Sequence, residues 1–161
     1  MSQQTDTVVH KTITVAASQE RAFEVYTAGF GSWWPKEHHI GAADMKTGTF
    51  EPKAGGRWYE TGVDSSECDW GRVLVWEPPH RLVHTWQLQG DWGYDADPAK
   101  GSEVEIRFVE EGPNQTRVEL THRYFERHGD GADRVRDGVS SPNGYDYCLA
   151  QYVAFIGAAT G

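Results

Sequence analysis

The sequence is poor in cysteine and in positive charge, and it has no hydrophobic run long enough to span a membrane. Its two cysteines, Cys68 and Cys148, exclude a disulfide framework, and because no signal peptide precedes them we expect free thiols in the cytoplasm. Fifteen Lys and Arg against 24 Asp and Glu give a net charge of −9, which argues against a nucleic-acid partner. The apolar stretch near the C-terminus is shorter than the about 20 residues of a spanning helix, so we expect no membrane insertion.

Aromatic residues are abundant by contrast. Seven Trp, seven Tyr and six Phe make up 12% of the chain, while its mean hydropathy is −0.65. Few but bulky apolar residues can fill a solid core or line a hollow one, and packing is the default for any one ring. No linker or repeat interrupts the 161 residues, which indicates a single domain over 1–161 with a polar tail at 1–6.

A long helix is predicted near the C-terminus, over residues 141–160. Tyr145, Leu149 and Tyr152 recur there at helical spacing, and the residues between them widen the apolar stripe. Ser141 is a candidate N-cap, and the proline after it suits a first helical turn. At about 1.5 Å per residue, this helix is long enough to cross a sheet of about five or six strands.

The chain upstream alternates between polar and apolar residues with the period of strands. A strand over 8–16 comes first, then a helix from its N-cap Ser18 to Gly29, then a loop or short broken helix over 30–40. From Thr47 onward, alternating segments separated by turns predict an antiparallel meander. We therefore expect an α+β fold in which a curved antiparallel sheet of about six to seven strands wraps around the C-terminal helix, with two short helices after the first strand.

Four motifs occur in an order that resembles a known superfamily. They are EPKAGGRWYE, GRVLVWEPPHRLVHTW, LTHRYFERHG and GYDYCLAQYVAFI. Their order is similar to that of the SRPBCC superfamily, also called START-like or helix-grip proteins, and most of all to its branch of activators of heat-shock-protein-90 ATPase. The resemblance implies a sheet gripping the long C-terminal helix, with a cavity between them that in relatives holds lipids, steroids or polyketides. It implies no catalytic set that can be carried over.

The inner face of the sheet is predicted to combine aromatic rings with a few polar groups, a mixture typical of small-molecule pockets. Because adjacent residues on a regular element point apart, we expect one of Trp33 and Trp34 in the core and the other at the mouth of a cavity. The predicted ligand-binding residues are Trp33, Trp34, Trp58, Glu60, Leu82, His84, Trp86, Leu120, His122, Tyr124, Tyr145, Leu149 and Tyr152.

Three of these residues, Glu60, His84 and His122, are candidate acid–base groups for a cyclase or dehydratase acting beside a carbonyl. The alternative is that they pair with one another or with tyrosines, as buried polar groups usually do. Cys148 is a poor candidate nucleophile, because a thiol on a buried helix is usually inert.

No metal site and no cofactor is predicted. His38 and His39 lie in a loop with Glu37 and Asp44 near them, but adjacent side chains diverge and no His pair has the spacing of a helical metal site. The aspartates of the loop 90–101 do not have the spacing of a calcium-binding loop.

Three functions are compatible with these patterns. The first is binding of a small hydrophobic ligand, namely a lipid, polyketide or aromatic metabolite, under the C-terminal helix. The second is a chaperone-interacting module, with the host chaperone as partner, and the third is the cyclase or dehydratase. Trp92 and Tyr94 are candidates for a lid or a partner surface, and the last helix is a candidate homodimer interface.

Overall fold

The computed structural model describes residues 8–89, 91 and 93–160. The predicted tail at 1–6 and the predicted lid residue Trp92 lie outside the described residues. Seven strands form one antiparallel sheet in the order β1-β7-β6-β5-β4-β3-β2. The strands are β1 (Val9–Val15), β2 (Met45–Phe50), β3 (Arg57–Gly62), β4 (Glu67–Glu77), β5 (Arg81–Trp86), β6 (Ser102–Gly112) and β7 (Gln115–Arg123).

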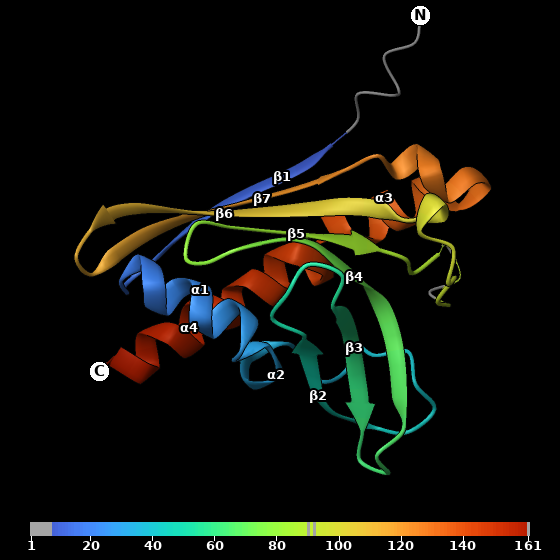
Figure 1. Cartoon of the computed structure of the whole chain (residues 1–161), viewed down its shortest axis with the longest axis horizontal. Coiled ribbons are helices and arrows are strands. Elements are labelled where there is room, and N and C mark those ends of the chain that lie inside the picture. The colour runs from blue at the N-terminus through green and yellow to red at the C-terminus, as the bar shows by residue number, and fades with distance from the viewer. Residues whose placement is uncertain (1–7, 90, 92, 161) are drawn as a thin grey trace, which may run out of the picture.

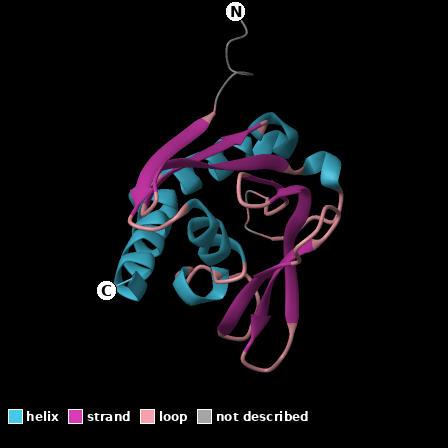
Figure 2. Cartoon of the chain, turned by 60° about the vertical axis from the view of Figure 1, so that its left-hand side comes forward, coloured by secondary structure: helices cyan, strands magenta, loops and turns pink. Residues whose placement is uncertain are grey.

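The sheet is a meander that curls into a half-barrel. Each strand from β2 to β7 pairs with its neighbour in sequence, even across the long link 87–101 between β5 and β6, and β1 closes onto β7. Figures 1 and 2 show that β2, β3 and β4 turn steeply away from β1, β6 and β7. The α+β fold and the curved sheet wrapped around a C-terminal helix are therefore confirmed.

The helices lie on the concave side of this sheet and at one end of it (Figure 2). Ser18 caps the first as predicted, since its hydroxyl accepts from the amide of Arg21 at 3.2 Å. The region 30–40 begins with the predicted short broken helix. The α-helices are α1 (Gln19–Thr27), α2 (Phe30–Trp33), α3 (Ala132–Ser140) and α4 (Tyr147–Thr160), and short helical segments are η2 (Pro98–Lys100), η3 (Phe125–Gly131) and η4 (Pro142–Asp146).

The last helix begins later than its apolar pattern predicts. Helix α4 starts at Tyr147, and η4 before it is a π-helical turn with a break at Gly144. Ser141 does not cap it: its hydroxyl donates instead to the carbonyl of Gly138 at 2.8 Å. Gly144 lies so close to α3 that an added Cβ would come 2.2 Å from the carbonyl oxygen of Val139. This contact requires glycine and bends the chain between α3 and α4.

Aromatic rings fill the core between the sheet and helices α1, α2 and α4. The hydroxyl of Tyr152, on α4, donates to the carbonyl of Ala22 on α1 at 2.7 Å. The ring of Tyr26 packs edge-on against both Tyr152 and Phe108 of β6, with centroids 5.3 and 5.7 Å apart. Such edge-to-face pairs add about 0.5–1.5 kcal/mol each to the burial of the rings.

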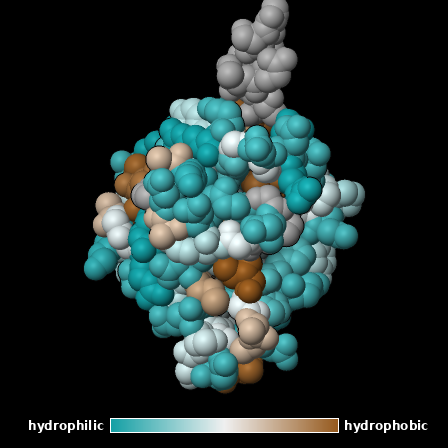
Figure 3. Space-filling model, turned by 90° about the vertical axis from the view of Figure 1, so that its right-hand side faces the viewer, coloured by the Kyte–Doolittle hydropathy of each residue, from teal (hydrophilic) through white to brown (hydrophobic). Residues whose placement is uncertain are grey.

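The surface is mostly polar on the face shown in Figure 3, where hydrophobic residues form small separate groups. Within the described residues, no helix is long and apolar enough to cross a membrane. Both cysteines are free thiols, Cys68 partly exposed on β4 and Cys148 buried on α4.

Candidate functional site

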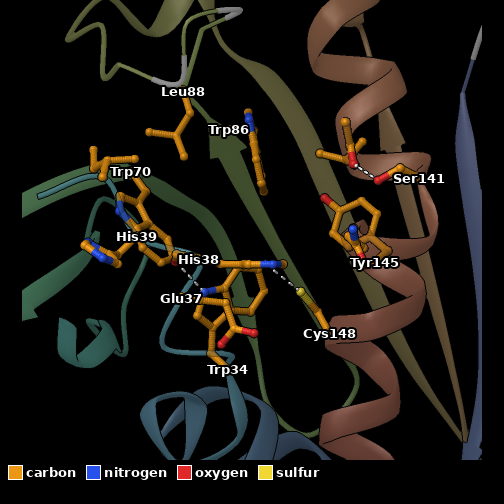
Figure 4. A pocket seen from close by; sticks show the side chains of 15 residues that line it. Trp34, Glu37, His38, His39, Trp70, Trp86, Leu88, Ser141, Tyr145 and Cys148 are labelled. Atoms are coloured by element: carbon orange, nitrogen blue, oxygen red, sulfur yellow. Dashed lines mark hydrogen bonds between the residues drawn. The ribbon is translucent and has the colours of Figure 1, made fainter. Parts of the chain in front are cut away.

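A cavity of about 450 Å³ lies at one end of the curled sheet. Its walls come from the loop after α2, from the ends of β4 and β5, and from the bend between α3 and α4, which faces them in Figure 4. The lining residues are Trp34, Glu37, His38, His39, Ile40, Trp70, Trp86, Leu88, Gly138, Val139, Ser141, Asn143, Gly144, Tyr145 and Cys148. The volume falls in the range of about 300–1,000 Å³ that small-molecule sites occupy.

Three indole rings form the apolar part of this cavity, and two of them belong to the predicted set. Trp34 and Trp86 line it as the sequence predicts, while Trp70, on β4, does not belong to that set. Trp34 and Trp70 pack against each other with ring centroids 5.7 Å apart. The adjacent Trp33 points into the core, where its Nε1 donates to the carbonyl of Val25 at 3.0 Å, so the two rings diverge as expected.

Glu60 is hydrogen-bonded to the loop after α2, which forms one wall of the cavity, but it does not face the cavity itself. Its carboxylate accepts from the amides of Ile40 and Gly41 at 2.6 and 3.1 Å, and from Trp70 Nε1 at 3.0 Å. The side chain is buried, and Glu60 does not line the cavity. Among the described residues, the nearest cationic candidate is the imidazole of His39, 3.7 Å away. Glu60 therefore positions the loop and an indole ring instead of facing a ligand.

Glu60→Gln is expected to lower the free energy of unfolding by about 1–3 kcal/mol, because the amide turns an N–H toward donors that the carboxylate now satisfies. Hydrogen exchange at the amides of Ile40 and Gly41 should accelerate, and mass spectrometry of the peptides that cover them measures it. Glu110→Gln, at an exposed position, is the control and should change neither quantity. Unchanged exchange in Glu60→Gln would show that the loop is held by something else.

The rim of the cavity carries polar groups that the sequence analysis did not assign to the site. His38 Nδ1 lies 3.5 Å from Cys148 Sγ, and the hydroxyl of Tyr147 donates to Glu37 at 2.8 Å (Figure 4 shows the first contact). Burial raises the pKa of Cys148 to about 12 and lowers the pKa of His38. The pair is therefore a neutral thiol beside a neutral imidazole at pH 7, not an ion pair of thiolate and imidazolium.

His84 lies in the core, away from the cavity. It packs against both Trp58 and Phe50, with ring centroids at 4.3 and 5.3 Å, and its Nδ1 lies 2.9 Å from the carbonyl of Thr85. The void beside it measures about 10 Å³, about the space of one water molecule. Burial lowers the pKa of His84 to about 4. The predicted acid–base candidate thus has no room for a substrate.

His122 is also fully buried, but it contacts the cavity wall through Tyr145. Its Nδ1 lies 2.9 Å from the hydroxyl of Tyr145, and its Nε2 lies 2.6 Å from Ser102 Oγ. Burial lowers the pKa of His122 well below its usual value, and the neighbouring imidazoles of His84 and His128 act in the same direction. His122 is hydrogen-bonded to the hydroxyl of a cavity residue, Tyr145, whereas Glu60 accepts from the N–H groups of the cavity residues Ile40 and Trp70.

The remaining predicted ligand-binding residues divide into buried and exposed ones. Tyr145 lines the cavity, while Trp33, Trp58, Leu82, Leu120, Leu149 and Tyr152 are buried in the core. The expectation that Tyr124 points inward is wrong, because β7 ends at Arg123 and Tyr124 adopts a left-handed conformation with φ of 67°. Its ring is 38% exposed and packs under the guanidinium of Arg127.

No group of three or more His, Cys, Asp or Glu side chains is arranged to hold a metal ion within residues 8–89, 91 and 93–160. Of the loop residues that were candidates for a lid, Tyr94 is half-buried and pairs with Leu88, a residue of the cavity wall, through an isolated β-bridge. That bridge links the loop 90–101 to the site through the backbone.

Comparison with known proteins identifies the family. The model of the "Activator of Hsp90 ATPase homolog 1-like protein" family matches residues 16–142. The chain belongs to this family. Its fold is accordingly the SRPBCC ligand-binding fold that the four motifs resemble. No curated protein sequence matches the chain significantly.

Several solved structures are similar to this chain over nearly its whole length. An anthrahydroquino-γ-pyrone synthase, solved in a complex, is 42% identical, with 92% of this chain and 96% of that chain covered and a TM-score of 0.67. A self-sacrificing resistance protein of Micromonospora echinospora is 32% identical, with 96% of each chain covered and a TM-score of 0.71. A protein of Mesorhizobium loti, 18% identical over 92% of this chain and 95% of that one, shares the fold with a TM-score of 0.64.

Proposed function

We propose that this protein binds a planar, largely apolar aromatic molecule, such as an aromatic polyketide, in the cavity beside the α3–α4 bend. The observation that carries the proposal is the cavity of about 450 Å³ walled by Trp34, Trp70 and Trp86. Indole rings offer flat faces for stacking, and each well-placed aromatic pair contributes about 0.5–1.5 kcal/mol beyond area burial. A flat ring system fits such walls better than a flexible lipid chain, which loses more conformational entropy on binding.

Polar groups beside the indoles are suited to the oxygen atoms of such a molecule. Trp86 Nε1 and His39 Nδ1 are buried and have no hydrogen-bond partner among the described residues. The unpartnered N–H of Trp86 costs free energy, and a ligand carbonyl or hydroxyl that reached it would recover part of this cost. The expected ligand therefore carries oxygen substituents on an aromatic frame.

The comparisons support the same ligand class. The relative at 42% identity is an anthrahydroquino-γ-pyrone synthase, and its name describes a fused aromatic product that carries oxygen. We infer that an aromatic polyketide is a better candidate here than a lipid or a steroid. The chaperone-interacting module stays a prediction that the family name alone supports, and the homodimer through α4 also stays a prediction.

Binding is tested with two neighbouring tryptophans. Trp34→Phe should weaken binding of 1,8-dihydroxyanthraquinone by about three- to tenfold, because the larger indole face is lost from the cavity wall. Isothermal titration calorimetry measures the affinity, and palmitate serves as the lipid comparison.

Trp33→Phe is the matched control for this experiment. Both indoles are buried and each donates its N–H to a backbone carbonyl at 3.0 Å, but Trp33 does not line the cavity. The two variants should lose similar stability, and Trp33→Phe should keep its affinity. Equal loss in both variants, or tighter binding of palmitate than of the anthraquinone, would contradict the proposed ligand class.

A second candidate function, ring closure of a polyketide, is favoured by the hydrogen bond between Tyr145 and the buried His122 and by the similarity to a synthase. In this function the protein binds the open precursor and moves a proton during cyclisation. Neither Glu60 nor His84 lines the cavity, so both are positioning or core residues in this proposal. Tyr145 is the group that would touch the substrate.

A further inference from the structure

A continuous chain of side-chain hydrogen bonds runs from the cavity wall to the outer end of the sheet. It starts at Tyr145, whose hydroxyl lies 2.9 Å from His122 Nδ1. His122 Nε2 lies 2.6 Å from Ser102 Oγ, which lies 2.7 Å from His128 Nε2. The chain ends where His128 Nδ1 lies 3.0 Å from Gln89 Oε1. The five residues come from the loop after β5, from β6, β7 and η3, and from η4.

The amide of Gln89 fixes the direction of the last link. Its Nε2 donates to the carbonyl of Lys100 at 2.9 Å and to the carbonyl of Gln87 at 3.4 Å. Both are acceptors, so the amide nitrogen must face them, and Oε1 must face His128. Because Oε1 can only accept, His128 Nδ1 carries a proton and donates it.

The remaining links follow from the single proton of each neutral imidazole. With Nδ1 protonated, His128 Nε2 is an acceptor, so the Ser102 hydroxyl donates to it. The Ser102 oxygen must then accept from His122, which places the His122 proton on Nε2. His122 Nδ1 is left as an acceptor, and the Tyr145 hydroxyl donates to it. Every hydrogen bond therefore points outward from the cavity, and the Tyr145 oxygen has a lone pair free to accept from a ligand.

We propose that this chain is a proton relay that lets Tyr145 act as the general base of the cavity, a role that rests on the proposed ring closure. The ligand gives a proton to the Tyr145 oxygen as Tyr145 passes its own proton to His122 Nδ1. His122 passes its Nε2 proton to Ser102, and Ser102 passes its hydroxyl proton to His128 Nε2. The ligand is left as an anion and His128 as an imidazolium, and no other atom changes its charge.

The neutral resting state of the groups, and the tendency of the proton to move back from His128 toward the cavity, agree with this scheme. Burial raises the pKa of Tyr145 well above its usual value and lowers that of His128 to about 4, so each group is neutral before reaction. Moving a proton from a phenol or an enol of the ligand to His128 is unfavourable, because the pKa of His128 is the lower one. His128 therefore holds the proton only briefly. It returns along the same path to the oxygen that receives it when the ring has closed.

A purely structural network would also satisfy these buried groups. Two features distinguish a relay from it. The proposed proton path begins at Tyr145, which lines the cavity, and its last proton acceptor is His128, which is 8% exposed, whereas Ser102 and His122 between them are fully buried. In addition, each acceptor along the path is also a donor to the next group, as stepwise proton transfer requires.

The assigned protons are tested first without any ligand. In ¹⁵N-labelled protein at pH 7, long-range ¹H–¹⁵N spectra should show His122 as the Nε2–H tautomer and His128 as the Nδ1–H tautomer. Opposite assignments in either ring, or a charged ring, would overturn the relay. This readout is independent of whether the protein binds an aromatic molecule.

Proton transfer is tested with 2-tetralone in D₂O, by following deuterium exchange at its α-carbon by ¹H NMR. Ser102→Ala interrupts the chain and should lower kcat for exchange at least tenfold with little change in KM, since Tyr145 still lines the cavity. Ser102→Thr, which keeps the hydroxyl, should restore most of the rate. Thr116→Val, which removes another fully buried hydroxyl, one that donates to the carbonyl of Ala17 at 2.9 Å, is the control and should exchange at the wild-type rate.

Three outcomes are separable. Binding of 2-tetralone, seen as quenching of tryptophan fluorescence, with exchange unaffected by Ser102→Ala, would overturn the relay and leave the binding function standing. Binding with no exchange above the buffer rate would also overturn it. Failure of the wild-type protein to bind either 2-tetralone or the anthraquinone would overturn the proposed function itself.

Discussion

Lowering the pH from 7 to 4 is expected to destabilise the folded protein by about 3 kcal/mol through His84 alone. Burial lowers the pKa of His84 from 6.5 to about 4 in the folded state, whereas the unfolded chain titrates near its usual value of about 6.5. Between these two pH values the unfolded state binds more protons, so the free energy of unfolding falls as the pH falls. His122 and His128, whose pKa values are also lowered by burial, add to the loss in the same direction.

Urea denaturation at several pH values measures this dependence. The slope should be steep between about pH 6.5 and 4 and nearly flat from about 7 to 8, where the histidines are neutral in both states. His84→Gln, which cannot take up a proton, should flatten the slope. His80→Gln, at an exposed position, should not. A slope that is the same in all variants would mean that His84 is not buried as described.

Gly144→Ala is the second change with a large expected effect, a loss of about 3 kcal/mol from steric overlap alone. The added methyl group would come 2.2 Å from the carbonyl oxygen of Val139 and 2.5 Å from that of Gly138. These are backbone atoms, so relief requires α3 and α4 to separate. Because Gly144, Val139 and Gly138 all line the cavity, affinity for the anthraquinone should fall together with stability.

Gly157→Ala provides the matched control, since both changes add one methyl group near or within α4. At Gly157 no clash with another element is found for the methyl group within the part of the chain that the structure describes, and alanine is favoured over glycine in a helix by about 1 kcal/mol. Thermal unfolding followed by circular dichroism should therefore show a lower midpoint for Gly144→Ala and an equal or higher one for Gly157→Ala. A stable Gly144→Ala variant would contradict the close packing of α3 on the bend.

The sheet was predictable because each strand carries its own signal. In β6, Val104, Ile106 and Phe108 face the core while charged residues alternate with them. This two-residue period can be read from the strand's own sequence, without knowing which strands pair with it. The start of α4 was not predictable in the same way. Its apolar pattern continues through Tyr145, and only the contact of Gly144 with a carbonyl from another helix shows why the chain bends there.

The site was less predictable than the fold, because it is assembled by segments far apart in the chain. Trp34, Trp86 and Tyr145 could be found from the faces of single elements. Trp70 was missed because the polar residues before it indicate a turn, whereas the structure begins β4 at Glu67. The sequence around His38 suggests no role other than metal binding, since nothing in its spacing reveals that its Nδ1 lies 3.5 Å from Cys148 Sγ.

The position of the cavity separates two tasks that many small domains combine. The hydrogen-bonded meander and the rings beneath it supply the stability, whereas two segments, 34–41 and 138–148, supply most of the residues that line the cavity. Natural selection can therefore change which molecule is recognised by altering these two segments, while the hydrogen bonds and the packing of the sheet stay the same. The loop 34–41 tolerates such variation better than packed strands do, so one scaffold can diversify its chemistry there at little cost to its ability to fold.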